Sequence, residues 1–203
     1  MTEEKAAIDT DFFIKITEKS KDGDLFIKLM NELNIRPVMH EYVYYEELSG
    51  NPVAESLVSN KYIEIIKYED FLAEGSNEWY ENAFREAYKY FNFDRFQGDV
   101  YTDKRKRRNL GEIRTALMAV SMGIRVFMSD DGGAKQYVKE RVNSKRHPLE
   151  VENIYDVLMI IAKKKDRKIS WAEVKGCAKR VIKDQKRYEE IKTQWHIDEK
   201  TTV

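Results

Sequence analysis

Short apolar runs along the chain are separated by longer stretches in which apolar residues recur at helical spacing. Each run has the length of a buried strand and is bounded by polar residues. The predicted strands lie at 5–9, 36–40, 124–129 and 147–153. Strands that alternate with helices indicate a parallel sheet with helices on both faces, so the pattern predicts an α/β fold.

The helical pattern fills the segments between these strands. Asn109 is a suitable N-cap for one helix and Gly123 a suitable stop, and Ser170 is a suitable N-cap for the last one. In the segment 53–98, aromatic residues recur at helical spacing, which indicates a helix packed through its aromatic side chains rather than a base-stacking surface. The predicted helices lie at 25–34, 41–50, 53–98, 109–123, 130–142, 152–164 and 170–193.

Composition narrows the class of protein. The 203 residues are 42% hydrophobic and 35% charged, which favours a soluble globular domain with an extension or two small domains. No apolar run approaches the roughly 20 residues of a membrane helix. The N-terminus lacks the apolar core of a secretory signal. With a single cysteine, Cys177, these features predict a cytoplasmic protein without membrane contact or an internal disulfide.

The net charge of zero conceals a division along the chain. Residues 1–100 carry 11 Lys and Arg against 21 Asp and Glu, a net charge of −10, so residues 101–203 carry +10. An acidic half can bind metal and a basic half can bind nucleic acid. Two halves that simply attract each other would show the same division, so charge alone leaves both interpretations open.

Acidic residues follow two of the predicted strands. Asp9 ends the first strand, and Asp130 and Asp131 follow the strand at 124–129. Sites in parallel sheets form outside the carboxyl ends of the strands. Two carboxylates about 4 Å apart repel by roughly 4 kcal/mol at an effective dielectric constant of 20, and a divalent cation can compensate this repulsion. Oxygen ligands favour Mg²⁺ or Mn²⁺, whereas the scattered histidines match no zinc site.

Three motifs, AAIDTDFF, YYEEL and LGEIRTALMAVSMGIRVFMSDDGGAK, resemble those of the PIN domain, a family of metal-dependent nucleases. The resemblance covers roughly residues 4–50 and 108–151. It implies a three-layer α/β/α fold with a central parallel sheet. On this basis we expect a nuclease domain at 1–151 with a helical insertion at about 51–108, followed by a C-terminal helical extension at 152–203.

The resemblance also implies the site. Four acidic residues match the catalytic positions of the family: Asp9, Glu47, Glu112 and Asp131. Of these, Asp9, Glu112 and Asp131 would bind Mg²⁺ or Mn²⁺. The hydroxyls of Thr10 and Ser129 could bind a phosphate oxygen or a ligand water. Two further acids are alternatives to their neighbours, Glu46 to Glu47 and Asp130 to Asp131. A third, Asp11, matches no carboxylate that the family requires, and it could assist the site or cap the following helix. The chain departs from the family at Ala116, where a further acid is common.

The substrate implied by the family is RNA. A basic run directly before the helix of Glu112 could bind the RNA backbone through its cations, although a solvated loop would look the same. Its candidate contact residues are Lys104, Arg105, Arg107 and Arg108. Family members of this kind also occur as toxins, so a protein inhibitor or antitoxin and a homodimer are further candidate partners.

Two rival interpretations remain open. The Asp9-x-Asp11 pair resembles the haloacid-dehalogenase phosphatases, in which the first aspartate would be the nucleophile and the second the general acid. The chain could also be a PIN-like module that binds nucleic acid or protein without catalysis. Because Ala116 stands where the family often has an acid, this second interpretation remains open.

Overall fold

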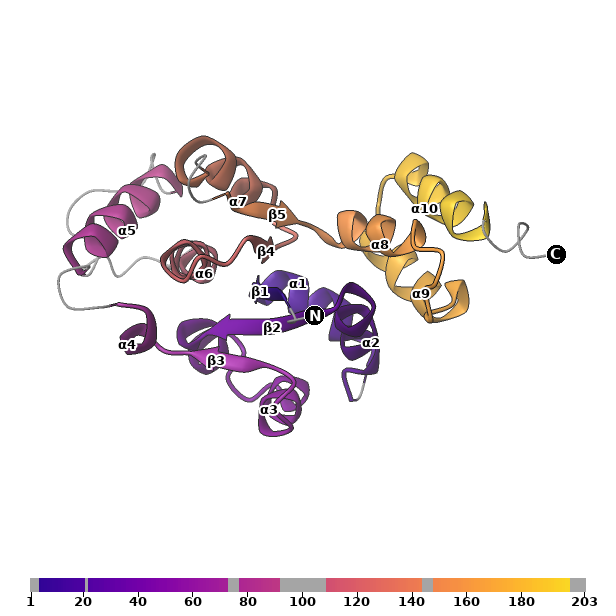
Figure 1. Cartoon of the computed structure of the whole chain (residues 1–203), viewed down its shortest axis with the longest axis horizontal. Coiled ribbons are helices and arrows are strands. Elements are labelled where there is room, and N and C mark those ends of the chain that lie inside the picture. The colour runs from indigo at the N-terminus through magenta and orange to yellow at the C-terminus, as the bar shows by residue number, and fades with distance from the viewer. Residues whose placement is uncertain (1–3, 21, 73–76, 92–108, 144–147, 198–203) are drawn as a thin grey trace.

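The centre of the protein is a five-stranded sheet with the order β3-β2-β1-β4-β5, in which every strand pairing is parallel (Figure 1). The computed structural model describes residues 4–20, 22–72, 77–91, 109–143 and 148–197. The predicted α/β class is therefore confirmed. The strands are β1 (Glu4–Ile8), β2 (Ile35–His40), β3 (Glu64–Ile66), β4 (Val126–Met128) and β5 (Glu150–Glu152).

The side chains of the central strands alternate between two cores. Ala6 and Ile8 of β1 are buried against one layer of helices, whereas Ala7 is buried against the other. Ala7 pairs with Val38 of β2 and Phe127 of β4, and both face the same core as Ala7. This period of two is the geometry of a strand buried on both sides.

Helices cover both faces of the sheet, giving three layers. The first layer contains α1 (Thr10–Thr17), α2 (Asp24–Leu33), the π-helical turn η1 (Val43–Glu47), α3 (Pro52–Ser59), α8 (Ile154–Ala162), α9 (Trp171–Val181) and α10 (Gln185–Ile197). The second contains α4 (Tyr68–Phe71), α5 (Asn77–Phe91), α6 (Leu110–Ser121), α7 (Gly132–Tyr137) and the π-helical turn η2 (Val138–Val142).

The C-terminal helices share a core with the N-terminal ones. In Figure 1, α8, α9 and α10 form a group beside α1 and α2. Trp195 is fully buried in the core that also contains Phe13 of α1 and Leu29 of α2. Trp171 is buried as well, and its ring centroid lies 5.8 Å from that of Trp195. Both tryptophans are therefore packing residues.

Three details of the predicted elements are wrong. The segment 51–108, expected to be helical, contains β3, whose three residues are too few to show a period of two. The helix expected at 170–193 is divided, because Ile182 is extended and Asp184 caps a new helix by accepting the Arg187 N–H at 2.9 Å. Asn109 precedes α6 in a left-handed conformation and makes no side-chain cap.

Two other expectations hold. Gly123 ends α6 with a φ of +67°, a value that glycine adopts without strain. Ser170 precedes α9, and its backbone N–H donates to Glu173 Oε2 at 2.8 Å. None of the described helices combines the length and the apolar character needed to span a bilayer.

Candidate functional site

The carboxyl ends of β1 and β4 lie side by side and bring the first and third motifs together. Ile8 pairs with Met128, and the Asp9 N–H donates to the Met128 carbonyl at 3.0 Å. Asp9 and Ser129 therefore leave the sheet at the same edge. The Ser129 hydroxyl donates to Asp9 Oδ2 at 2.9 Å, which fixes the carboxylate between the two strand ends.

Asp9 is almost fully buried, with 1% of its surface exposed. Its Oδ1 accepts the Thr10 N–H at 2.7 Å, so the side chain also caps α1. Burial raises the pKa of Asp9 well above its usual value, and the charge of Glu112 raises it further. These two effects outweigh the hydrogen bonds from Ser129 and Thr10, which lower the pKa. An ionised Asp9 in this place requires compensation by positive charge.

Glu112 lies in the first turn of α6 and is electrostatically coupled to the other candidate acids. Partial burial raises its pKa to about 7, and the nearby charges of Glu47, Asp131 and Asp11 contribute to the increase. Like charges in one place disfavour simultaneous ionisation. The structure therefore brings Glu112 within electrostatic range of all three other predicted catalytic residues.

Glu47 reaches the site from the end of η1 and contacts the first turn of α6. Its Oε1 accepts the Gly111 N–H at 3.2 Å, and its Oε2 accepts the Thr10 hydroxyl. A Cβ on Gly111 would lie 2.7 Å from Glu47 Oε1, so only glycine leaves room for this carboxylate. Sequence reasoning missed Gly111. The available signal was a glycine inside the first turn of a helix, where it weakens the helix unless close packing requires it.

Asp131 follows β4 and caps α7. Its Oδ1 accepts the N–H groups of Gly133 at 2.5 Å and Ala134 at 3.0 Å. Its own N–H donates to the Ser129 hydroxyl oxygen at 3.3 Å, so Ser129 connects Asp131 to Asp9. The Ser129-x-Asp131 motif thus supplies both the carboxylate of Asp131 and the hydroxyl that orients Asp9.

The three alternative acids lie in different surroundings. Asp130 is paired with Lys15 of α1 at 2.8 Å. Asp11 is exposed and lies 3.4 Å from the same lysine, although its charge still reaches Glu47 and Glu112. Glu46 and Glu47 are both exposed on η1, but Glu47 accepts hydrogen bonds from Thr10 and Gly111. These differences favour Asp9, Glu47 and Asp131 over their neighbours as site residues.

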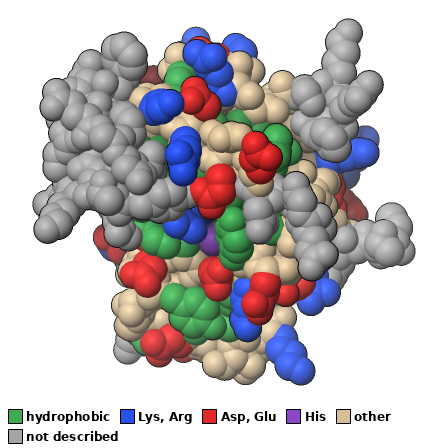
Figure 2. Space-filling model, turned by 90° about the vertical axis from the view of Figure 1, so that its left-hand side faces the viewer, with side chains coloured by type: hydrophobic (Ala, Val, Ile, Leu, Met, Phe, Trp, Pro, Cys, Tyr) green, Lys and Arg blue, Asp and Glu red, His purple; other side chains and the backbone are tan. Residues whose placement is uncertain are grey.

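The predicted RNA-contact residues Lys104, Arg105, Arg107 and Arg108 fall outside the described residues. Figure 2 shows the side of the molecule on which α4 and α5 lie in Figure 1. On the described part of that side, acidic and basic side chains are interspersed with hydrophobic ones. On this described part of the surface, acidic and basic side chains are therefore mixed and do not form one acidic and one basic patch.

The chemistry of the four acids fits a hard divalent cation. They offer only carboxylate oxygens, the ligands that Mg²⁺ and Mn²⁺ prefer. Over the described ranges, no Lys or Arg forms an ion pair with Asp9, Glu47, Glu112 or Asp131. No three His, Cys, Asp or Glu side chains among the described residues are already grouped as metal ligands. The carboxylates are instead oriented by Ser129, Thr10 and Gly111.

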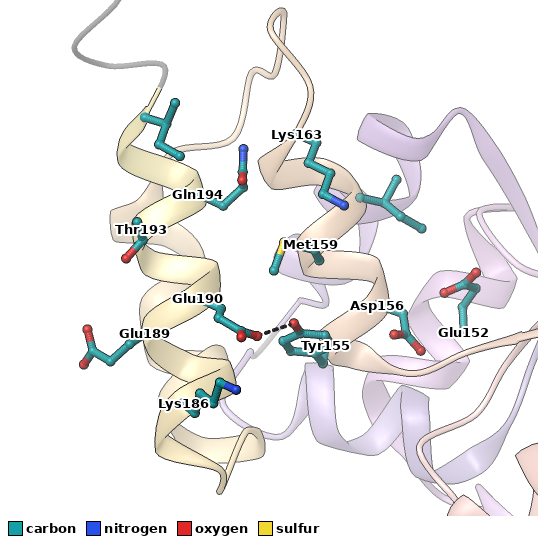
Figure 3. Close-up of a pocket in the computed structure, with 12 residues that line it drawn as sticks. Glu152, Tyr155, Asp156, Met159, Lys163, Lys186, Glu189, Glu190, Thr193 and Gln194 are labelled. Carbon is teal, nitrogen blue, oxygen red and sulfur yellow. Dashed lines mark hydrogen bonds between the residues drawn. The ribbon is translucent and has the colours of Figure 1, made fainter.

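A groove of about 780 Å³ lies elsewhere, between α8 and α10 (Figure 3). Met159 and Ile160 contribute apolar surface to it, and Lys163 and Lys186 lie at its margins. None of the four candidate acids lines this groove. The size of this groove therefore does not connect it with the candidate acids, which lie at the strand ends.

Comparison with known proteins identifies no relative. No protein-family model matches the chain, and neither a curated protein nor a solved structure is significantly similar to it.

Proposed function

We propose that this protein is a ribonuclease of the PIN type that uses Mg²⁺ or Mn²⁺ to hydrolyse RNA phosphodiester bonds. The observation that supports this most is the charge of the strand-end site. Four acidic residues from separate segments of the chain interact there, and no described cation of the protein pairs with them. A cluster of this kind is costly unless a bound cation compensates it.

The electrostatics support a cation at Asp9, Glu112 and Asp131. The raised pKa values of Asp9 and Glu112 measure how unfavourable their charged forms are without compensation. A divalent ion favours the ionised carboxylates and would lower both pKa values. When bound, the ion would stabilise charge on the scissile phosphate and lower the pKa of a water ligand.

The residues of the chain itself have separate roles in this proposal. Asp9, Glu112 and Asp131 would hold the cation. Ser129 orients Asp9, because its hydroxyl donates to the buried Oδ2. Glu47 is held by Gly111 and Thr10 and would bind the attacking water or accept its proton. Cys177 is buried, and burial raises the pKa of its thiol to about 11, so a thiolate nucleophile is disfavoured.

The fold also supports the proposal of a PIN-type nuclease. The motifs AAIDTDFF and SDDGG lie at adjacent strand ends of a parallel sheet with helices on both faces. This is the arrangement that the PIN resemblance implies. The phosphatase alternative places its general acid at Asp11. That residue is exposed and lies 3.4 Å from Lys15, so we favour the nuclease.

The test is cleavage of a labelled single-stranded RNA with Mn²⁺ by four variants. Asp9→Asn and Asp131→Asn should each lose cleavage and remain folded, because an amide keeps the shape but not the charge. Glu47→Gln should lose most activity, whereas the matched control Glu46→Gln should retain it. Full cleavage by folded Asp9→Asn or Asp131→Asn would contradict the proposal.

The same preparation separates the nuclease from the phosphatase. A small aryl phosphate is offered to the wild-type protein and to Asp11→Ala. A nuclease should leave this compound intact, and Asp11→Ala should still cleave RNA. Turnover of the aryl phosphate that depends on Asp11, with RNA left intact by the wild type, would establish the phosphatase instead.

A further inference from the structure

A hollow of about 270 Å³ adjoins the strand-end site on the side of the C-terminal helices. Ser129 and Asp131 line it together with Lys183 and Arg187. Lys183 lies in the break between α9 and α10, and Arg187 lies in the first turn of α10. The hollow is called the Lys183–Arg187 pocket below. It connects the candidate site to the part of the chain that the PIN resemblance does not cover.

The carboxylates of this pocket already have partners. Asp130 is paired with Lys15 at 2.8 Å, and Asp131 accepts two N–H groups at the start of α7. Asp184 accepts the backbone N–H of Arg187 at 2.9 Å and caps α10. One cation of the pocket is also neutralised, because Lys135 lies 2.7 Å from Asp156.

Lys183 and Arg187 differ from these groups. Both are exposed, and neither forms an ion pair with any residue in the described part of the chain. The Arg187 guanidinium carbon lies 5.2 Å from the centre of the Tyr155 ring, so the aromatic face orients it. A guanidinium held in this way keeps its hydrogen-bond donors available for a planar or bidentate anionic partner.

We propose that the Lys183–Arg187 pocket binds a backbone phosphate of the RNA strand beside the phosphate that is cleaved. This inference rests on the proposed nuclease function and extends it. Ser129, which lines the pocket, is hydrogen-bonded to Asp9, so the pocket adjoins the candidate carboxylates, and a strand bound at them would extend toward the two cations. The C-terminal helices then have a function beyond packing, because they supply one wall of the substrate path.

The test measures binding of a fluorescein-labelled single-stranded RNA in the presence of a chelator, which prevents cleavage. The test variant is Lys183→Gln/Arg187→Gln. Its control is Lys163→Gln/Lys186→Gln, which removes the same charge from the margins of the neighbouring groove in Figure 3. Arg187→Lys keeps the charge and serves as the conservative variant. Affinity is recorded between about 50 and 200 mM salt.

The expected result is a loss of roughly tenfold in affinity for the test variant. The slope of log affinity against log salt should also decrease in magnitude by about 0.7 for each phosphate that the variant no longer binds. The control pair should bind like the wild type, and Arg187→Lys should retain most of the affinity. With Mn²⁺ and RNA concentrations varied across the KM, cleavage by the test variant should show a larger increase in KM than decrease in kcat.

Two results would overturn the proposal while leaving the nuclease in place. One is wild-type affinity of the test variant in a protein that cleaves RNA. The other is an equal loss of affinity in the test and control pairs, which would show a general effect of net charge. A wild-type protein that neither binds nor cleaves RNA would overturn the pocket and the proposed function together.

Discussion

The Ser129 hydroxyl donates a hydrogen bond of 2.9 Å to Asp9 Oδ2 and joins two strand ends that are 120 residues apart in the chain. Each of the two residues has only 1% of its surface exposed. A buried carboxylate oxygen depends on such a donor, because water cannot replace it without opening the structure. The pair therefore contributes both to the order of the candidate site and to the stability of the sheet.

Ser129→Ala should destabilise the protein by about 1–3 kcal/mol, because it leaves Asp9 Oδ2 buried without its partner. Urea unfolding at neutral pH measures the change in the free energy of unfolding. Ser121→Ala is the control, since that hydroxyl donates to the Leu117 carbonyl at the exposed end of α6. Equal decreases in the free energy of unfolding of the two variants would show that the Ser129–Asp9 hydrogen bond stabilises the protein no more than an exposed one.

Glu112 should make stability fall as the pH rises. Its pKa is about 7 in the folded protein, against a usual value of 4.5, so the folded state binds more protons between these pH values than the unfolded state. Stability then decreases with pH through this window. The melting temperature of the wild type, measured with a chelator, should decline more steeply from pH 5 to about 7 than that of Glu112→Gln. Parallel curves would contradict this prediction.

Mn²⁺ should reverse the same effect. A cation bound to ionised carboxylates stabilises the folded state by mass action, most strongly where the carboxylates are least favourable on their own. Added Mn²⁺ should therefore raise the melting temperature of the wild type more at pH 7.5 than at pH 5. Asp9→Asn should show little of this increase at either pH.

Gly111→Ala should impair catalysis without unfolding the protein. Alanine favours a helix by up to about 1 kcal/mol over glycine, but its Cβ would lie 2.7 Å from Glu47 Oε1 and displace that carboxylate. The rate of RNA cleavage should fall about 10- to 100-fold. Gly176→Ala in α9 is the control, because its added Cβ would have no heavy atom within 4 Å apart from its chain neighbours and the backbone of its own helix. It should gain stability and cleave normally.

Trp195→Ala should strongly destabilise the whole domain, because the C-terminal helices share a core with α1 and α2. Trp195 is fully buried and contacts Trp171, so its truncation should cost about 3–5 kcal/mol in the free energy of unfolding. Trp79 of α5 is 48% exposed, and Trp79→Ala should cost less than about 1 kcal/mol. A single cooperative transition monitored by both fluorescence and circular dichroism would accompany the predicted loss.

The strand-end acids could be predicted because local pattern and parallel topology act together there. Asp9 and Asp131 follow apolar strands, and parallel strands end at the same edge. Gly111 could not be assigned a role in this way. Its importance depends on a carboxylate that arrives from 64 residues earlier in the chain. A single sequence contains the glycine but does not indicate that the Glu47 carboxylate packs against it.

The missed strand has a similar cause. Glu64, Ile65 and Ile66 form β3 because Val38, Met39 and His40 offer a free edge of the sheet. The local sequence around them is compatible with either state, so tertiary pairing decides. The division between α9 and α10 has a different cause: local capping at Asp184 starts a new helix in a stretch whose helical periodicity continues through the break.

The order of the strands has a consequence for synthesis on the ribosome. β1 is synthesised before β4, with which it pairs, and α1 and α2 share a core with the much later helices α8, α9 and α10. Contacts of such long sequence separation form slowly and late. The emerging chain therefore exposes Asp9 and its apolar strand long before Ser129 and Asp131 arrive to complete the site.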